Sequence, residues 1–321
     1  MGFIRFDEIE KVEFDEKQYL KTGIKGLDEK ICGFGLGQLI VLTGARAGGK
    51  TTLIGQITCN FIEQGYTGLL CSFEMSNPRL QRWLTVQALG KDNLTVRRMT
   101  TGTPISIPKS EKSEKAAVDW IGKRLLVYDN KTFNADEVAS DIKKQVERNP
   151  QIKFIILDNL MKFDFSGRSD NKYDEQSRFV KRLQAYAQTQ GICVILIAHP
   201  NKVKTIPRIE DVGGSGDIIN TADTVIFVHR VTTDFKARAK EYFEWKETAA
   251  ELRVDNLIEI VKDREFGDDN SFIGVYFEPI AKRFLNSKGE NIQYSFTAPN
   301  YQTRILPTLT EIKDDDEQIP F

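Results

Sequence analysis

Short apolar runs alternate with longer segments of helical periodicity between about residue 38 and residue 230. Strands of a parallel sheet covered by helices on both faces are apolar throughout, whereas the crossover helices repeat with a period near 3.6. The pattern therefore predicts an α/β fold with a mostly parallel sheet and flanking helices. Six strands are expected, at residues 38–43, 68–73, 124–128, 153–157, 193–198 and 224–229.

Two of the predicted helices have readable starts. Asn77 followed by Pro78 is expected to cap one helix, with the proline in its first turn. Asn134 with Glu137 three residues later resembles a capping box. Residues 101–116, which contain two prolines and many Lys and Ser residues, are expected to form an exposed loop.

The composition and the periodicity of the sequence change after residue 230. Residues 231–255 are rich in Lys, Glu and Ala and predict a helical insertion. Residues 256–284 predict a β-hairpin that turns around Gly267, Asp268 and Asp269.

Composition narrows the class of protein. A chain of 321 residues with 40% hydrophobic and 28% charged residues is typical of a soluble globular protein. Its longest apolar runs fall far short of the ~18 residues of a membrane-spanning helix. The net charge of -1 argues against a histone-like polyanion binder, and four scattered cysteines with two histidines indicate neither a disulfide framework nor a zinc site. With no signal peptide at the start, a cytoplasmic location is expected, in the host cell if the gene belongs to a phage.

A phosphate-binding loop follows the first predicted strand and precedes a helix. Residues 44–51 read Gly-Ala-Arg-Ala-Gly-Gly-Lys-Thr and match the pattern G-x-x-x-x-G-K-[ST]. Glycines let backbone N–H groups face phosphate oxygens, the lysine adds charge toward the β and γ phosphates, and the threonine hydroxyl can bind Mg²⁺. We expect ATP or another nucleoside triphosphate, with Mg²⁺, to contact Gly44, Ala45, Arg46, Ala47, Gly48, Gly49, Lys50, Thr51 and Thr52.

Two acids follow apolar strands. Asp158 comes directly after four apolar residues and is the candidate second Mg²⁺ ligand, although it could merely cap the next helix. Glu74 ends the strand at residues 68–73, so it should project at the carboxyl edge of the sheet, where α/β proteins bind ligands. It is the candidate base that orients water. Judged by spacing alone, however, Glu74 could also be an acid that follows a strand by chance and has no catalytic role.

Together these motifs resemble the RecA-like motor domain of hexameric replicative helicases of the DnaB type, especially the branch of phage primase-helicases and Twinkle. The resemblance covers residues 22–284. Its opening Thr-Gly-x-x-x-Leu-Asp stands at residues 22–28, and its Ser-x-Glu-Met at residues 72–75, where the resemblance makes Glu74 the hydrolytic base.

Three further segments carry the resemblance. His199 ends a strand where that branch has a polar sensor of the γ-phosphate. Lys262 and Arg264 match the K-x-R element that reaches the nucleotide of the neighbouring subunit, with Arg264 as the finger. Residues 211–216 resemble the glycine-serine segment after the channel loop, but Gly213 stands where relatives often have arginine. Without the resemblance, the alternative for Lys262 and Arg264 is that they are solvent-exposed side chains on an edge strand.

The loop from Asn201 to Gly216 suits binding to a nucleic-acid backbone. Lysines neutralise phosphates, and glycine N–H groups can approach them closely without reading bases. The residues expected to contact single-stranded DNA are Lys202, Lys204, Arg208, Gly213, Gly214, Ser215 and Gly216. By composition alone, a mobile surface loop with ordinary lysines remains the alternative.

The sequence motifs say less about which residues contact the adenine ring of the nucleotide. Arg230 at a strand end, and Tyr276 or Phe277 in the hairpin, could stack on adenine as in relatives, whereas core packing is the alternative for the two aromatics. Arg46 could contact nucleotide or face solvent.

The expected domain plan is a linker or subunit-docking segment at residues 1–20, a motor domain at 21–305 and an acidic tail at 306–321. The linker could equally be a disordered lead, and no primase segment is expected. Five acids and one lysine fall in residues 311–321, which end in Ile-Pro-Phe. This tail resembles the docking tails of phage replication proteins, which implies a basic partner such as a DNA polymerase or another replisome protein.

The sequence thus predicts a replicative DNA helicase, an enzyme that hydrolyses NTP to move along single-stranded DNA and unwind duplex. The resemblance implies 5′-to-3′ movement and a homo-oligomer, expected to be a six-membered ring. A RecA-like recombinase and a nucleotide-gated scaffold protein remain alternatives.

Overall fold

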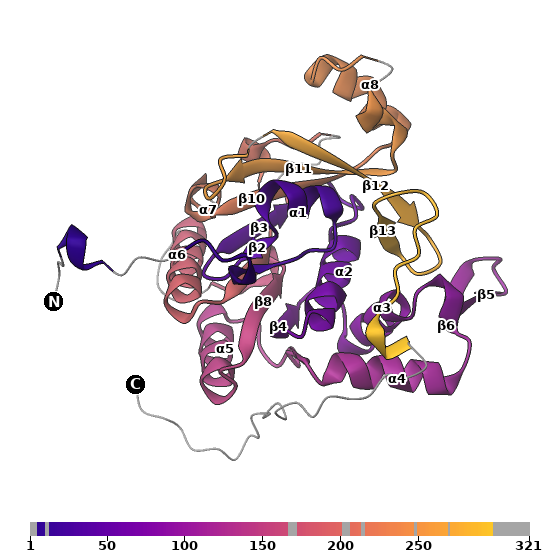
Figure 1. Cartoon of the computed structure of the whole chain (residues 1–321), viewed down its shortest axis with the longest axis horizontal. Coiled ribbons are helices and arrows are strands. Elements are labelled where there is room, and N and C mark those ends of the chain that lie inside the picture. Colours follow the sequence, from indigo (N-terminus) through magenta and orange to yellow (C-terminus); the bar gives the residue numbers. More distant parts are fainter. Residues whose placement is uncertain are drawn as a thin grey trace.

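A nine-stranded sheet forms the centre of the computed structural model, which describes residues 5–9, 13–165, 172–200, 206–212, 216–246, 249–268 and 270–297 (Figure 1). From edge to edge its strands are β13 (Arg283–Leu285), β12 (Ser271–Glu278), β11 (Asn256–Asp263), β10 (Thr224–Arg230), β3 (Leu39–Thr43), β9 (Cys193–Ile197), β8 (Ile152–Asp158), β4 (Thr67–Ser72) and β7 (Leu125–Val127). The predicted acidic tail lies outside the described residues.

The sheet is parallel from β10 to β7 and antiparallel from β10 to β13. All six strands predicted from the sequence are confirmed, and so is the hairpin, which is formed by β11 and β12. The third antiparallel strand, β13, was not predicted. Its three residues are too short a run to show an alternating pattern.

Helices cover both faces of the sheet. One face carries α1 (Lys25–Ile31), α2 (Lys50–Glu63), α3 (Asn77–Leu89) and α4 (Glu111–Gly122). The other carries α5 (Ala135–Arg148), α6 (Lys172–Gln190) and α7 (Gly216–Thr221). Successive residues of the central strand β3 serve the two cores in turn: Ile40 and Leu42 pack in the first, and Leu39 and Val41 in the second. This double burial explains why the strand is apolar throughout.

Two small antiparallel pairs lie outside the main sheet. The strands β1 (Tyr19–Leu20) and β2 (Phe34–Gly35) form one, and β5 (Leu94–Arg98) and β6 (Pro104–Pro108) form the other. The helical insertion predicted after residue 230 is confirmed in part, as α8 (Thr233–Tyr242) and a 3-10 turn at Ala250–Arg253. No described helix is both long and apolar enough to cross a membrane.

Two local predictions were wrong. The segment 101–116 is not a loop, because it contains β6 and the start of α4. Its prolines stand at the two ends of a strand, a place where proline is tolerated, and Ser110 caps α4 by accepting a hydrogen bond from the backbone N–H of Ser113.

The predicted cap of α3 is displaced by one residue. Ser76 is the N-cap, and the Asn77 side chain instead donates to the carbonyl of Tyr128. The cap of α5 is confirmed, because the Asn134 side chain accepts from the backbone N–H groups of Asp136 and Glu137, but the capping box is not completed, because the backbone N–H of Asn134 donates to the Thr132 hydroxyl instead.

Candidate nucleotide-hydrolysis site

The phosphate-binding loop joins β3 to α2, as the sequence predicted. Gly44 and Gly49 have φ of 143° and 107°. A Cβ at Gly44 would lie 2.3 Å from the carbonyl oxygen of Val228 in β10, and one at Gly48 would lie 2.7 Å from the same atom. Asn256 of β11 donates to the carbonyl of Gly48 over 2.8 Å. The loop therefore lies directly against β10, where only glycine fits.

Lys50 is the first residue of α2 and is buried. Its Nζ donates to the carbonyls of Gly44 and Ala45, at 2.8 and 3.0 Å. Burial lowers the pKa of Lys50, while Glu74 and Asp158 act in the opposite direction. The ammonium group is thus folded onto its own loop, close to two acids, in a place where a phosphate oxygen would be a stronger acceptor than a carbonyl.

Three strands end side by side at this edge of the sheet. Asp158, the last residue of β8, is paired in register with Ser72 of β4 and Ile197 of β9. Its side chain is 7% exposed and accepts no hydrogen bond from any residue that the structure describes. Burial, together with Glu74, raises the pKa of Asp158 to about 6. An anion in this setting is costly unless a cation joins it.

Glu74 follows β4 and lies beside two polar side chains. His199, which follows β9, places its Nε2 3.1 Å from Glu74 Oε1. The Asn159 amide donates to the same oxygen. His199 keeps the pKa of Glu74 below its ordinary value despite partial burial, with Lys50 adding to the effect. The structure therefore brings together four of the predicted site residues, Lys50, Glu74, Asp158 and His199, and keeps Glu74 ionised.

The other predicted nucleotide contacts lie around this centre. Thr51 is half-buried and Thr52 is buried at the start of α2, and Arg46 is exposed. Arg230 is exposed at the end of β10, two residues beyond the strand position that packs on Gly44. These positions are compatible with nucleotide contacts.

The two hairpin aromatics differ in their surroundings. Tyr276 is half-buried, with the ammonium of Lys288 5.3 Å from its ring centroid. Phe277 is 40% exposed and packs edge-on against Phe284. Stacking of either ring on a base stays a prediction.

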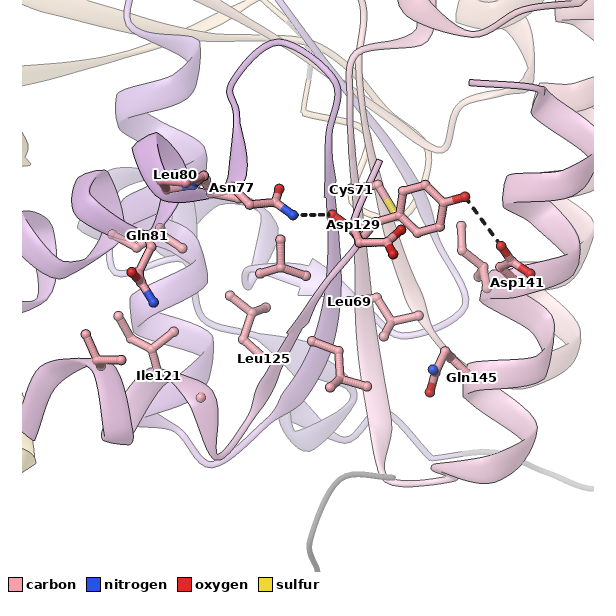
Figure 2. Close-up of a pocket in the computed structure, with 18 of the residues that line it drawn as sticks. Leu69, Cys71, Asn77, Leu80, Gln81, Ile121, Leu125, Asp129, Asp141 and Gln145 are labelled. Atoms are coloured by element: carbon pink, nitrogen blue, oxygen red, sulfur yellow. Dashed lines mark hydrogen bonds between the residues drawn. The ribbon is translucent and has the colours of Figure 1, made fainter. Parts of the chain in front are cut away.

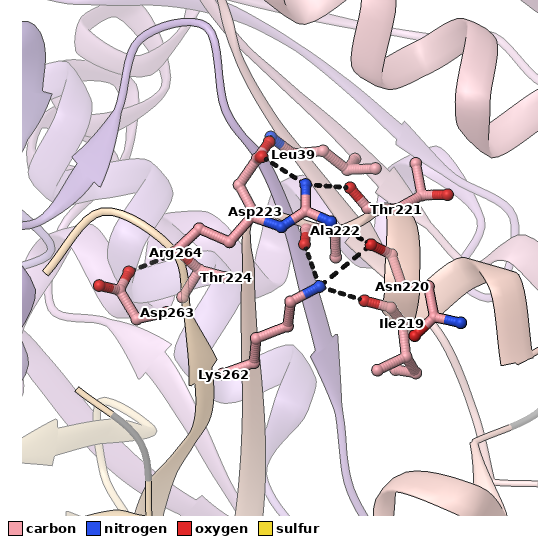
Figure 3. A network of polar contacts seen from close by, with 10 residues as sticks. All are labelled: Leu39, Ile219, Asn220, Thr221, Ala222, Asp223, Thr224, Lys262, Asp263 and Arg264. Carbon is pink, nitrogen blue, oxygen red and sulfur yellow. Dashed lines mark hydrogen bonds and ion pairs between the residues drawn. The ribbon is translucent and has the colours of Figure 1, made fainter. Parts of the chain in front are cut away.

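The side chains of Lys262 and Arg264 meet at the end of α7 (Figure 3). Lys262 Nζ donates to the carbonyls of Ile219, Asn220 and Ala222, at 2.8, 3.1 and 2.8 Å. A lysine at this end of a helix satisfies carbonyls that have no partner within the helix.

Arg264 occupies the same place. Its guanidinium donates to the carbonyls of Asn220 and Thr221 and lies 3.3 Å from Asp223 Oδ1. Asp223 in turn accepts from the backbone N–H of Leu39, the first residue of β3. In the single chain, neither cation hydrogen-bonds to the phosphate-binding loop among the described residues.

Most of the predicted DNA-binding loop lies outside the described residues: Lys202, Lys204, Gly213, Gly214 and Ser215. Arg208 is described and exposed, with its guanidinium 4.3 Å from the ring centroid of Tyr242. Gly216 is exposed and begins α7. The loop therefore leads directly into the helix that Lys262 and Arg264 cap.

Sequence reasoning missed Asn159, Asp223 and Asn256. Asn159 could have been noticed as a polar residue next to the strand-end acid Asp158. The other two act through contacts to segments 184 and 208 residues away in the chain, for which the sequence carries no local signal.

A glycine loop between strand and helix, a buried lysine and two strand-end acids define a P-loop nucleotide hydrolase site on a mostly parallel sheet. The sequence of residues 19–286 matches the model of a protein family, the DnaB-like helicase C terminal domain, and the chain belongs to that family.

Known proteins agree with this assignment. The replicative DNA helicase DnaB of Rickettsia bellii is 23% identical over 293 residues, which cover 83% of this chain and 57% of the relative. The chain spans about half the length of the curated relatives it matches.

Solved structures show the same fold. A DnaB-like replicative helicase whose interactions with primase were studied superposes with a TM-score of 0.64 at 17% identity, covering 83% of this chain and 63% of that one. A KaiC-like protein of the hyperthermophilic archaeon Pyrococcus horikoshii gives a TM-score of 0.53 at 20% identity, covering 83% of this chain and 98% of that one. The fold is therefore that of the RecA-like ATPase domains of this family.

Proposed function

We propose that the protein is a replicative DNA helicase, which uses NTP hydrolysis to move along single-stranded DNA in the 5′-to-3′ direction and unwinds the duplex ahead. The observation that carries the proposal is the joint placement of Lys50, Asp158, Glu74 and His199 at one edge of the sheet, inside a domain of the DnaB-like family. Neither the recombinase nor the scaffold alternative has an observation of its own that favours it.

The residues at the site fit a nucleotide and Mg²⁺. Backbone N–H groups of the loop at residues 44–49 and Lys50 bind the phosphates of ATP or another NTP or dNTP. Thr51 and Asp158 hold Mg²⁺, which supplies charge neutralisation for the phosphates. The fit rests on Asp158, a buried carboxylate with a raised pKa that accepts no hydrogen bond from the described residues.

Glu74 orients the attacking water and takes its proton. It can do so because His199, 3.1 Å away, favours its ionised form, and because the Asn159 amide donates to its carboxylate. His199 also senses the γ-phosphate, since it links Glu74 to the end of β9, after which the DNA-binding loop begins. Hydrolysis and loop position are thereby connected.

Charge on the transferring phosphoryl group is stabilised from the neighbouring subunit. Arg264, with Lys262 beside it, would leave the end of α7 and reach the nucleotide of the next copy in a homo-oligomeric ring, which we propose has six members. Lys202, Lys204, Arg208 and the glycine-serine segment 213–216 track the DNA backbone in the channel. That segment leads into α7, and Lys262 and Arg264 bind the end of the same helix. A shift of α7 on DNA binding would therefore also move the contacts of Arg264.

The N-terminal segment 1–20 would join neighbouring motor domains, each formed by residues 21–305. Two of its side chains, Phe6 and Ile9, are 90% and 53% exposed on their own chain. A cavity of about 740 Å³ lies at the open edge of β7, between α3, α4 and α5 (Figure 2). Leu80, Ile121 and Leu125 give it an apolar lining, so it can receive such side chains from the next copy.

The acidic tail 306–321 is proposed to bind a basic partner, a DNA polymerase or another replisome protein. Removal of residues 311–321 should spare ATPase activity and weaken that contact in a pull-down, and unchanged binding would discard this part of the proposal. We further propose that the protein acts in the cytoplasm, that of the host if the gene belongs to a phage.

Unwinding of forked DNA tests the function. The wild-type protein should hydrolyse ATP faster with single-stranded DNA and unwind a fork only when it has a 5′ single-stranded arm. The Glu74→Gln variant should keep nucleotide binding and lose both activities. Joint-molecule formation without unwinding would identify a recombinase instead, and ATPase activity that ignores both DNA and Glu74→Gln would leave only a scaffold.

A further inference from the structure

The hairpin of β5 and β6 projects from the motor domain beside α3 and α4 (Figure 1). Its register pairs Leu94 with Pro108 and Arg98 with Pro104, and β6 packs on both helices. Neither helix carries a residue of the hydrolysis site described above. The hairpin therefore lies outside the hydrolysis site.

The outer edge of β5 is open. The backbone N–H of Lys109 donates to the carbonyl of Asn93, and that of Met99 donates to the carbonyl of Thr103. Because hydrogen-bonded pairs alternate along an antiparallel ladder, the backbone groups of Val96 and Arg98 face away from β6. No described strand pairs with this edge. The edge of β6 is protected by prolines at both ends, whereas β5 has none, so only β5 can accept another strand.

The open edge is basic and partly apolar. Residues 91–109 contain four Lys or Arg residues and one acid. Arg97 and Arg98 are exposed and form no ion pair with any described acid, and Val96 and Met99 are 47% and 49% exposed. An extended acidic segment that also carries apolar residues would complement both features.

Residues 311–321 of the same chain have that chemistry. Asp314, Asp315, Asp316 and Glu317 follow one another directly, so a strand made from them presents acids on both faces. Arg97 and Arg98 likewise lie on opposite faces of β5. Ile319 and Phe321 supply the apolar side chains.

The described chain stops beside α4, the helix that follows the hairpin in the chain. Phe296 and Tyr294 pack on Trp120 in α4, and Asn291 donates to Asp92 at the root of the hairpin over 2.6 Å. Thirteen residues, 298–310, separate this place from the acidic run. They span at most about 45 Å when extended. The length of α4 and of one hairpin strand together comes to about 35 Å, so the acidic run can reach β5.

We infer that residues 311–321 bind along β5 of their own chain as an added antiparallel strand, with the acids beside Arg97 and Arg98 and with Ile319 on the same face as Val96 and diagonal to it. A basic partner of the tail must then compete with the hairpin. The inference is independent of helicase activity, since neither surface belongs to the hydrolysis site.

A photo-crosslinking residue in place of Phe321 in the full chain tests this inference. Crosslinks should map to residues 91–96, at the start of β5. They should fall at least tenfold in Arg97→Glu/Arg98→Glu and weaken as salt rises. The matched control Lys112→Glu/Lys115→Glu reverses two exposed cations on α4, closer to the described end of the chain, and should leave them unchanged.

Three results would overturn the inference. Crosslinks that map to another surface, or that survive Arg97→Glu/Arg98→Glu in a chain whose circular dichroism is unchanged, would remove the hairpin as the site. Crosslinks that join only isotopically light to heavy chains in a mixture would place the tail on another copy. Loss of single-stranded DNA affinity in Arg97→Glu/Arg98→Glu, with crosslinks unchanged, would make the hairpin a nucleic-acid surface.

Discussion

The replacement Asp158→Asn should stabilise the protein when metal and nucleotide are absent. Burial and Glu74 raise the pKa of Asp158 from 3.8 to about 6. Between these values the folded state keeps a proton that the unfolded chain has released, so the free energy of unfolding of the wild type falls as pH rises from about 4 to about 6. At about 1.4 kcal/mol per pH unit, the carboxylate costs the fold about 3 kcal/mol above pH 6.

Urea denaturation in EDTA, followed by circular dichroism from pH 4 to pH 8, measures this difference. Asp158→Asn should match the wild type near pH 4 and exceed it by about 2 to 3 kcal/mol at pH 8. Asp119→Asn, which changes a partly exposed acid on α4, should stay within about 0.5 kcal/mol at every pH.

Addition of Mg²⁺ and nucleotide should reverse the order. A ligand at about 1,000 times its Kd adds about 4.1 kcal/mol to the wild type, which exceeds the lead of about 2 to 3 kcal/mol that the variant has in EDTA, and Asp158→Asn should gain far less. A variant that is less stable than wild type in EDTA at pH 8, or a difference that does not change with pH, would refute the reasoning that this acid is held ready for a cation.

The remaining predictions concern the loop, the base and a helix cap. Gly44→Ala should abolish nucleotide binding in a filter or fluorescence assay, because its Cβ would meet the Val228 carbonyl at 2.3 Å, whereas Gly122→Ala, which meets nothing within 4 Å, should bind normally. His199→Ala should move the acid limb of the kcat profile to higher pH, since Glu74 loses the group that lowers its pKa, and an unmoved limb would exclude this role. Ser110→Ala should lower the free energy of unfolding by about 1 kcal/mol through loss of the α4 cap.

The sequence allowed the sheet and the hydrolysis centre to be predicted because both depend on local patterns. Strands buried on two faces are apolar runs, and the phosphate-binding loop is one continuous motif at residues 44–51. Asp158 and Glu74 could be placed together because parallel strands end at the same edge.

What could not be predicted depends on contacts between distant segments. The capping of α7 by Lys262 and Arg264 joins residues about 40 positions apart, and the K-x-R motif carries no sequence signal for these contacts. The hairpin of β5 and β6 was hidden because its prolines suggested a loop, although they stand at strand ends.

Mixing two inactive variants tests most directly whether each site is completed by a neighbour. Lys50→Ala subunits lack their own phosphate contact but keep Arg264, and Arg264→Ala subunits have the reverse defect. At equal amounts about a quarter of the interfaces in a ring should join an intact loop to an intact finger. We predict that DNA-stimulated ATPase activity is near zero in each variant alone and is highest when the two variants are mixed in about equal amounts. No recovery at any ratio, with mixed oligomers demonstrated by native mass spectrometry, would contradict hydrolysis at shared sites.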